Sequence, residues 1–290
     1  MNTIKNFPLT NFDTNIMENI ISQKYKDLKK INFLGKIDDV DPNLNTLTFA
    51  SNSDYFNTAK RKGFSFILYN ENIDDDSVIY SKNPRSDFLK IINWINKNGK
   101  YELLNPSISS KISVGQNVKI GNNVVIEDGV KIGNNVVIED NCFISKDVII
   151  DDFAKIGGYG FEIENSETLQ LSGIHGGVFI GANSFIKNFT NIDRSVWGLN
   201  TIINSNVAID SHVLIGHDVF VGDNSQIRGG SVVAGFSKIG NNSVVGIGTN
   251  FLQRSSIGND SLTSANSIIT KNFDNNSKII AQPSKVFKNN

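Results

Sequence analysis

The sequence contains few of the features on which several classes of protein depend. Its single cysteine, Cys142, excludes an intramolecular disulfide framework and suits a reducing cytosol. Lys and Arg total 28 against 29 Asp and Glu, so the positive excess typical of nucleic-acid-binding proteins is missing. No apolar run is long enough for a signal peptide at the start or for a membrane span elsewhere. These absences predict a cytoplasmic protein that binds no nucleic acid and has no integral membrane segment.

What the sequence does contain is an aliphatic residue at every sixth position within each of three runs. This spacing differs from the 3.6-residue period of an amphipathic helix and is typical of a parallel β-helix, in which each hexad is one strand and one turn. Gly, Asn, Asp or Ser follows nearly every aliphatic position, and these residues tolerate turn dihedrals. Of the 23 repeat positions, 21 are Val or Ile: Val114, Ile120, Ile126, Ile132, Ile138, Ile144, Ile150 and Ile156; Ile180, Ile186 and Ile192; and Ile203, Ile209, Ile215, Val221, Ile227, Val233, Ile239, Val245, Phe251, Ile257, Thr263 and Ile269.

The predicted fold class is therefore mainly β, a parallel β-helix of hexapeptide repeats preceded by a small α/β domain. Three hexads close one triangular coil, and the stacked Ile and Val side chains form a long, thin core. We expect a left-handed winding because hexapeptide-repeat proteins generally have it, although the usual crossover rule predicts the opposite hand.

The repeat also defines the domain boundaries. Within the first domain we expect strands at 65–69 and 77–80 and a helix at 19–29, and a further helix at 87–95 leads to the coil. The predicted regions are a small α/β domain (1–84), a linker helix (85–106), the β-helix (107–272) with an excursion loop (157–177), and a short C-terminal tail (273–290).

Two interruptions of the repeat are candidate functional regions, because solenoids place chemistry on loops that leave the coil. The excursion 157–177 contains Gly157, Gly158 and Gly160 close together. This glycine cluster is compatible with a phosphate-binding loop, but it lacks a following helix and a P-loop lysine. The alternative is a loop that closes over a ligand or a neighbouring subunit. The second interruption is a one-residue slip between Ile192 and Ile203.

His217 is the candidate general base. It stands two positions after the core residue Ile215, where we expect an outward side chain, and a neutral imidazole can accept a proton at neutral pH. Asp210 follows the core position of the preceding hexad. Gly235 is 18 residues beyond His217, one full coil, so its N–H is a candidate oxyanion donor. The alternative is a solvated turn histidine.

The three histidines also allow a metal site to be considered. His175, His212 and His217 are the only ones, and zinc needs neutral imidazoles that converge on one point. His212 and His217 fall at different positions of their hexads, and His175 lies in the excursion loop. We therefore predict no metal site.

Several stretches resemble the UDP-3-O-acylglucosamine N-acyltransferases, hexapeptide-repeat enzymes of lipid A synthesis that act on UDP-amino sugars. The run 213–230, VLIGHDVFVGDNSQIRGG, is similar to that family's catalytic segment, and the run 190–194, TNIDR, resembles its Thr-Ile-Asp-Arg motif. The run 47–55, LTFASNSDY, resembles its uridine-binding segment, and 83–85, NPR, the end of its first domain.

The resemblance implies roles for individual residues. His217 would be the general base, Asp210 its supporting acid and Gly235 the oxyanion amide. Phe49, Asn52 and Tyr55 would bind uracil, since aromatic faces stack on a flat base and an amide reads its edge. Gly160 and Phe161 fall where the family has a Gly-Phe-rich loop, and His175 where the chain enters the next coil. All three would bind substrate. Two features depart from the family, namely the absence of a helical tail and Asp218 in place of the usual Asn after the base.

The sequence therefore predicts an N-acyltransferase that moves an acyl group from a thioester to the amine of a UDP-linked amino sugar for lipopolysaccharide or surface-glycan synthesis. Acyl-CoA is the favoured donor because the helical tail is absent, and 3-hydroxyacyl carrier protein, as in lipid A synthesis, is the alternative. No metal or redox cofactor is expected. Hexapeptide-repeat acyltransferases are generally homotrimers, and we expect the same here. A non-catalytic trimeric scaffold is the alternative of another class.

Overall fold

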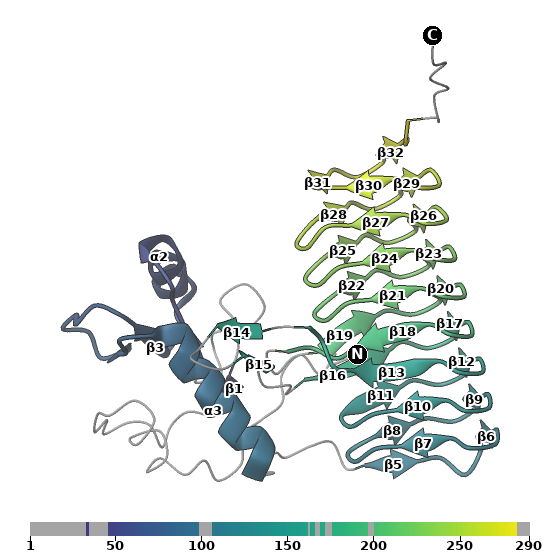
Figure 1. Cartoon of the computed structure of the whole chain (residues 1–290), viewed down its shortest axis with the longest axis horizontal. Helices are drawn as coiled ribbons and strands as arrows, with labels where there is room; N and C mark the ends of the chain where they lie inside the picture. Colours follow the sequence, from purple (N-terminus) through teal and green to yellow (C-terminus); the bar gives the residue numbers. More distant parts are fainter. Residues whose placement is uncertain are drawn as a thin grey trace. The chain divides into compact units, whose positions relative to one another are not determined.

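The computed structural model describes residues 33–34, 46–98, 106–161, 163–165, 169–171, 176–196 and 200–282 (Figure 1). The chain forms two compact units. The first consists of Met1–Pro106, Tyr159–Gly177 and Arg194–Asn200, and the second of Ser107–Gly158, Val178–Asp193 and Thr201–Asn290. Both interruptions of the repeat thus group with the amino-terminal unit.

The second unit is a left-handed parallel β-helix, as predicted, and its coils are stacked in sequence order (Figure 1). Each coil passes through three sheets, which we number in chain order. Sheet 1 contains β5 (Ser107–Ile108), β8 (Val125–Ile126), β11 (Cys142–Ile144), β16 (Gly177–Ile180), β19 (Asn200–Ile203), β22 (Phe220–Val221), β25 (Lys238–Ile239), β28 (Ser256–Ile257) and β31 (Asn272–Phe273). Sheet 2 contains β6 (Ser113–Val114), β9 (Lys131–Ile132), β12 (Ile149–Ile150), β17 (Phe185–Ile186), β20 (Ala208–Ile209), β23 (Gln226–Ile227), β26 (Val244–Val245), β29 (Leu262–Thr263) and β32 (Lys278–Ile279). Sheet 3 contains β7 (Lys119–Ile120), β10 (Val137–Ile138), β13 (Lys155–Gly158), β18 (Asn191–Asp193), β21 (Leu214–Ile215), β24 (Val232–Val233), β27 (Asn250–Phe251) and β30 (Ile268–Ile269).

The predicted repeat positions form the core of this unit. In uninterrupted coils each strand pairs with the strand 18 residues later, as Ile138 does with Ile156, so identical hexad positions stack. Every predicted position from Ile126 to Ile269 is buried, including Phe251 and Thr263. Val114 lies in β6, the end strand of sheet 2, and is 47% exposed. The β-helix continues to Ile279 in β32, beyond the expected end at residue 272.

The turns explain why asparagine is so frequent. Many turn residues three positions after a core residue have φ between 54° and 68°, the left-handed region that Asn tolerates best among residues with a side chain. Asn206, Asn224 and Asn242 also form a ladder, in which each side-chain amide donates to the next at 3.2 Å. At another corner Phe153, Phe189 and His212 occupy this position, and their rings stack with centroids 5.0 Å apart.

The first unit has a four-stranded parallel sheet, which confirms the predicted strands at 65–69 and 77–80. Its strand order is β1 (Phe33–Leu34), β2 (Thr46–Phe49), β3 (Phe66–Tyr69) and β4 (Val78–Tyr80). Helix α2 (Ser53–Lys62) connects β2 to β3, and α3 (Pro84–Asn98) follows β4. A separate antiparallel pair, β14 (Ile163–Asn165) and β15 (Leu169–Leu171), lies in the excursion. The helix predicted at 19–29 lies outside the described residues.

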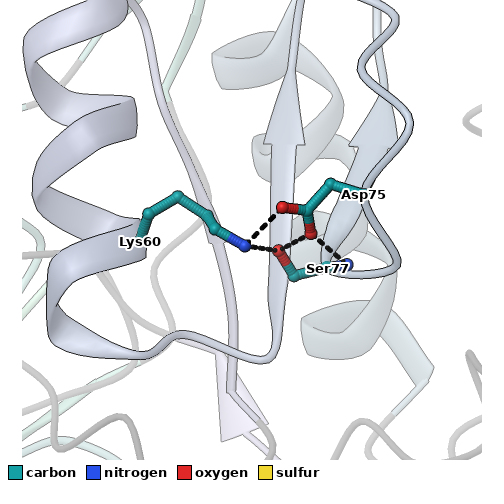
Figure 2. Close-up of polar contacts among 3 residues, drawn as sticks. All are labelled: Lys60, Asp75 and Ser77. Carbon is teal, nitrogen blue, oxygen red and sulfur yellow. Dashed lines mark hydrogen bonds and ion pairs between the residues drawn. The ribbon is translucent and has the colours of Figure 1, made fainter.

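A polar cluster fixes α2 to the loop before β4 (Figure 2). The Lys60 ammonium lies 2.6 Å from Asp75 Oδ2 and donates to Ser77 Oγ at 2.8 Å. The other Asp75 oxygen accepts from the Ser77 backbone N–H at 2.9 Å and from its hydroxyl at 2.6 Å. The hydrogen bond from Lys60, supported by those from Ser77, lowers the pKa of Asp75 to about 2.

Among the helices of the described ranges, none is both long and apolar enough to cross a membrane.

Candidate active site

Both interruptions of the repeat leave the coil at the same corner, where the chain passes from sheet 3 to the next sheet 1. We call it the 3–1 corner. The excursion follows β13, and the second interruption follows β18 on the next coil. His217 follows β21, one coil further on, so it lies at the same corner. The predicted base therefore stands where the solenoid departs from regularity.

His217 is buried, with 6% of its surface exposed, which contradicts the alternative of a solvated turn histidine. The ring makes an edge contact with Phe236, with centroids 4.9 Å apart and an interplanar angle of 85°. It also lies against Gly235, where a Cβ atom would come within 2.6 Å of both Cε1 and Nε2. The predicted stacking of Gly235 on His217 is thus confirmed, and the glycine makes room for the ring.

Asp218 is the carboxylate that contacts His217. Its Oδ2 lies 2.9 Å from Nδ1, and both side chains are almost inaccessible to solvent. The Asp218 backbone N–H donates to Thr201 Oγ1 at 2.9 Å, and the residue has the left-handed φ of 59° common to these turns. A carboxylate at Nδ1 holds the proton on that nitrogen, leaves Nε2 as the basic atom and stabilises the imidazolium.

Asp210 does not contact His217, so its predicted supporting role is not borne out by the geometry. It follows β20 and therefore lies at the corner between sheets 2 and 3. Its carboxylate accepts from the backbone N–H of Ser211 at 2.7 Å and of Gly229 at 3.2 Å. The carboxylate that does contact His217 belongs to Asp218, and its position directly after His217 in the sequence was the signal for this contact.

The Gly235 N–H is a candidate donor to a ligand. At the same hexad position elsewhere, the N–H is capped by an Asn or Asp side chain 18 residues later: Ser205 by Asp223 at 2.9 Å, Asp223 by Asn241 at 2.9 Å and Asn241 by Asn259 at 2.8 Å. Gln253 stands one coil after Gly235, and no acceptor within the described ranges receives this N–H. The donor therefore lies beside His217 without the usual cap.

A second carboxylate, Asp193, lies at the 3–1 corner on the coil before His217. Asn191 Nδ2 donates to its Oδ1 at 2.6 Å. Burial raises the pKa of Asp193, whereas the Asn191 hydrogen bond and the nearby His217 and Lys155 oppose the rise. Sequence reasoning placed Asp193 in the TNIDR motif but gave it no role. The burial of Asp193 near His217 became visible only in the structure.

The predicted uracil-binding residues lie at the end of β2 and the start of α2. The Phe49 ring packs on the buried Phe88 ring with centroids 5.1 Å apart. Asn52 caps α2, where its Oδ1 accepts from the Tyr55 N–H at 3.0 Å, as an N-cap residue commonly does. The Tyr55 side chain is exposed. The three residues are thus close in the fold, and their uracil-binding role stays a prediction.

The described part of the excursion loop places two more of the predicted residues. Gly160 is buried, and Phe161 is highly exposed. The neighbouring Tyr159 lies under the Arg194 guanidinium, which is 4.8 Å from the ring centroid. This contact joins the two interruptions. His175 lies outside the described residues.

His212 and His217 do not converge. They flank β21 at its two ends, with His212 in the exposed aromatic ladder and His217 at the 3–1 corner. In the parts of the chain that the structure describes, no group of three or more His, Cys, Asp or Glu side chains could hold a metal ion.

Comparison with known proteins yields a family match and a set of distant structural likenesses. Residues 111–146 match the bacterial transferase hexapeptide (six repeats) family. LpxA from Acinetobacter baumannii is 22% identical, with 61% of this chain and 69% of that chain covered and a TM-score of 0.43. The UDP-N-acetylglucosamine acyltransferase from Campylobacter jejuni is 25% identical, with 58% and 68% covered and a TM-score of 0.36. No curated protein matches the sequence significantly. The chain thus carries the hexapeptide repeat of bacterial transferases, folded as a left-handed β-helix.

Proposed function

We propose that this protein is an N-acyltransferase that moves an acyl group from a thioester to the amine of a UDP-linked amino sugar. The observation that carries the proposal is the buried His217–Asp218 pair, 2.9 Å apart, which lies against Gly235, whose N–H bonds to no acceptor in the described part of the chain. A base and an oxyanion donor on the same corner are the two groups that acyl transfer requires.

In the proposed reaction the sugar amine attacks the thioester carbonyl carbon. A C–N bond forms, and the carbonyl electrons move onto oxygen, where the Gly235 N–H donates a hydrogen bond. His217 Nε2 takes a proton from the nitrogen while Asp218 stabilises the imidazolium. The C–S bond then breaks, and the imidazolium returns the proton to the departing thiolate. A general base contributes roughly 10²–10⁴ in rate, and an oxyanion donor roughly 10²–10³.

Two observations support a UDP group in the acceptor substrate. The run 47–55 resembles a uridine-binding segment, and its Phe49, Asn52 and Tyr55 lie together around the start of α2. The structurally similar proteins include enzymes described as UDP-N-acetylglucosamine acyltransferases. We assign UDP to the acceptor on this basis. Gly160, Phe161 and His175 stay proposed substrate-binding residues of the excursion loop.

We propose acyl-CoA as the donor, with 3-hydroxyacyl carrier protein as the alternative. The thioester is a co-substrate, and the proposed reaction uses no metal or redox cofactor. We further propose a cytoplasmic homotrimer, since flat sheet faces suit a closed cyclic interface.

Mass spectrometry of UDP-amino sugars incubated with the protein tests this function. Acetyl-CoA and 3-hydroxyacyl carrier protein are supplied in parallel reactions, and UDP-N-acetylglucosamine serves as the acceptor without a free amine. We expect an amide product from acetyl-CoA. A long-chain amide formed only from the carrier protein would reassign the donor. The absence of any acylated product with either donor would overturn the enzyme assignment and favour a scaffold.

A further inference from the structure

The proposed mechanism uses one carboxylate of the 3–1 corner and leaves Asp193 without a role. Asp193 ends β18, and β18 pairs with β21 in the register Ile192 to Ile215. Neighbouring strands lie about 4.8 Å apart, so Asp193 is one coil from the turn that carries His217. A charge on His217 also lowers the pKa of the Asp193 carboxyl.

The surroundings of Asp193 hold one of its oxygens and leave the other available. Asn191 donates to Oδ1 at 2.6 Å, and among the described residues no donor bonds to Oδ2. On the preceding coil stands Gly158, where a Cβ atom would lie 2.9 Å from Asp193 Oδ1 and from Asn191 Oδ1. A side chain at that position would press on the pair, and glycine avoids this contact.

The number of protons on the nucleophile then distinguishes two classes of acceptor. A hydroxyl nucleophile has one hydrogen, which it donates to His217 Nε2. A neutral amine has two hydrogens, so one remains after His217 is satisfied. A partly buried carboxylate beside the base is a suitable acceptor for that second N–H, and with a hydroxyl substrate it would stay unpaired.

We propose that Asp193 accepts the second N–H of the acceptor amine and thereby makes the site selective for an amino sugar over the corresponding hydroxy sugar. The inference rests on the proposed function, because it assigns the acceptor of that same site. Leaving a desolvated acceptor unpaired disfavours the wrong substrate strongly, and hydrogen bonds to charged groups correspond to roughly 10- to 100-fold in binding.

Asp193→Asn is a sharp test because Asn191 holds one end of the side chain. The Asn191 amide donates, so it retains the oxygen of the new side chain, and the new amide nitrogen turns toward the substrate. That nitrogen cannot accept an N–H. Asp151→Asn is the matched control, since Asp151 also directly follows a core residue but lies at another corner, 3.2 Å from the Lys187 ammonium.

The assay compares the UDP-amino sugar with the UDP-sugar that has a hydroxyl in place of the amine. The first is measured as a substrate, and the second as a competitive inhibitor and a substrate. For Asp193→Asn we expect kcat/KM with the amine to fall roughly 10- to 100-fold, while the Ki of the hydroxy sugar stays unchanged or decreases. Asp151→Asn should alter neither. Asn191→Ala releases Asp193 Oδ1. Like Asp193→Asn, it should lower kcat/KM with the amino sugar and leave the Ki of the hydroxy sugar unchanged or lower.

An equal loss for both sugars, or an unchanged preference for the amine in Asp193→Asn, would overturn the role of Asp193 while leaving the acyltransferase intact. If the wild-type protein acylates neither sugar, the proposed function fails, and the role of Asp193 fails with it.

Discussion

Replacing Gly235 by alanine would insert one methyl group against the His217 ring. The added Cβ would lie 2.6 Å from Nε2 and Cε1, whereas ordinary contacts begin at 3.4 Å. The ring or the turn must therefore move by roughly 0.8 Å, the difference between these distances. The Asp218 contact at 2.9 Å and the Phe236 edge contact restrict where the ring can go.

The displacement affects the catalytic geometry more than the fold. A misplacement of about 1 Å can lower the rate roughly 10²-fold, and overpacking of this kind costs about 1–3 kcal/mol of unfolding free energy. We expect Gly235→Ala to reduce kcat by about two orders of magnitude and to stay folded, because the β-helix core residues on both sides are unchanged. Steady-state kinetics with the UDP-amino sugar, together with circular dichroism melting, measure both quantities.

Gly240→Ala is the matched control, which separates the effect of steric crowding on stability from the effect on catalysis. Its Cβ would lie 2.4 Å from backbone atoms of Gly258 and Asn259, a comparable conflict at another corner of the coil. This variant should lose stability and keep kcat per folded molecule. Normal turnover in Gly235→Ala would refute the placement of the reaction beside the His217 ring.

Three further predictions concern the supporting residues. Asp218→Asn should lower kcat at least 10²-fold, since the amide no longer stabilises an imidazolium on His217. Asp223→Asn is the control, because Asp223 is a turn carboxylate outside the site, and it should leave kcat unchanged. Equal kcat values for the two variants would contradict the role of the His217–Asp218 pair. Asn224→Ala should reduce the unfolding free energy by about 1–2 kcal/mol in urea titrations, because its φ is 57°, and Asn224→Gly should lose less; equal losses would argue against backbone strain. Lys60→Met should cost about 0.2–1 kcal/mol at pH 7, since the pair is partly exposed. Because the folded pKa of Asp75 is lowered from 3.8 to about 2, this difference should shrink as the pH falls from about 4 to 2 and vanish only below the folded pKa. A difference at pH 2 as large as at pH 7 would contradict the pairing.

The fold could be predicted from the sequence because one short-range rule governs most of the chain. Apolar residues at every sixth position, such as Ile209, Ile215 and Val221, are buried and so identify the coil. Stacking of the coils then places residues 18 apart on each other. The same arithmetic placed Gly235 on His217 correctly. It needs only positions along the chain and no knowledge of side-chain direction.

The direction of side chains at the turns could not be predicted in this way. Counting hexad positions placed His217 at an outward position of its turn, and the family resemblance implied Asp210 as its supporting acid. In the structure the Asp218 carboxylate lies at Nδ1, and Phe236 packs against the ring at an interplanar angle of 85°. The role of Asp193 likewise depends on contacts between coils whose register is shifted by the insertions.

Single-turnover kinetics of His217→Ala test whether His217 is the base for acyl transfer. Acetyl-CoA and a saturating UDP-amino sugar are mixed with excess protein, and sugar binding is measured separately by calorimetry. We expect a transfer rate lower by roughly 10²–10⁴, with unchanged affinity for the nucleotide sugar, because only the proton acceptor is removed. A transfer rate near that of the wild type would contradict it.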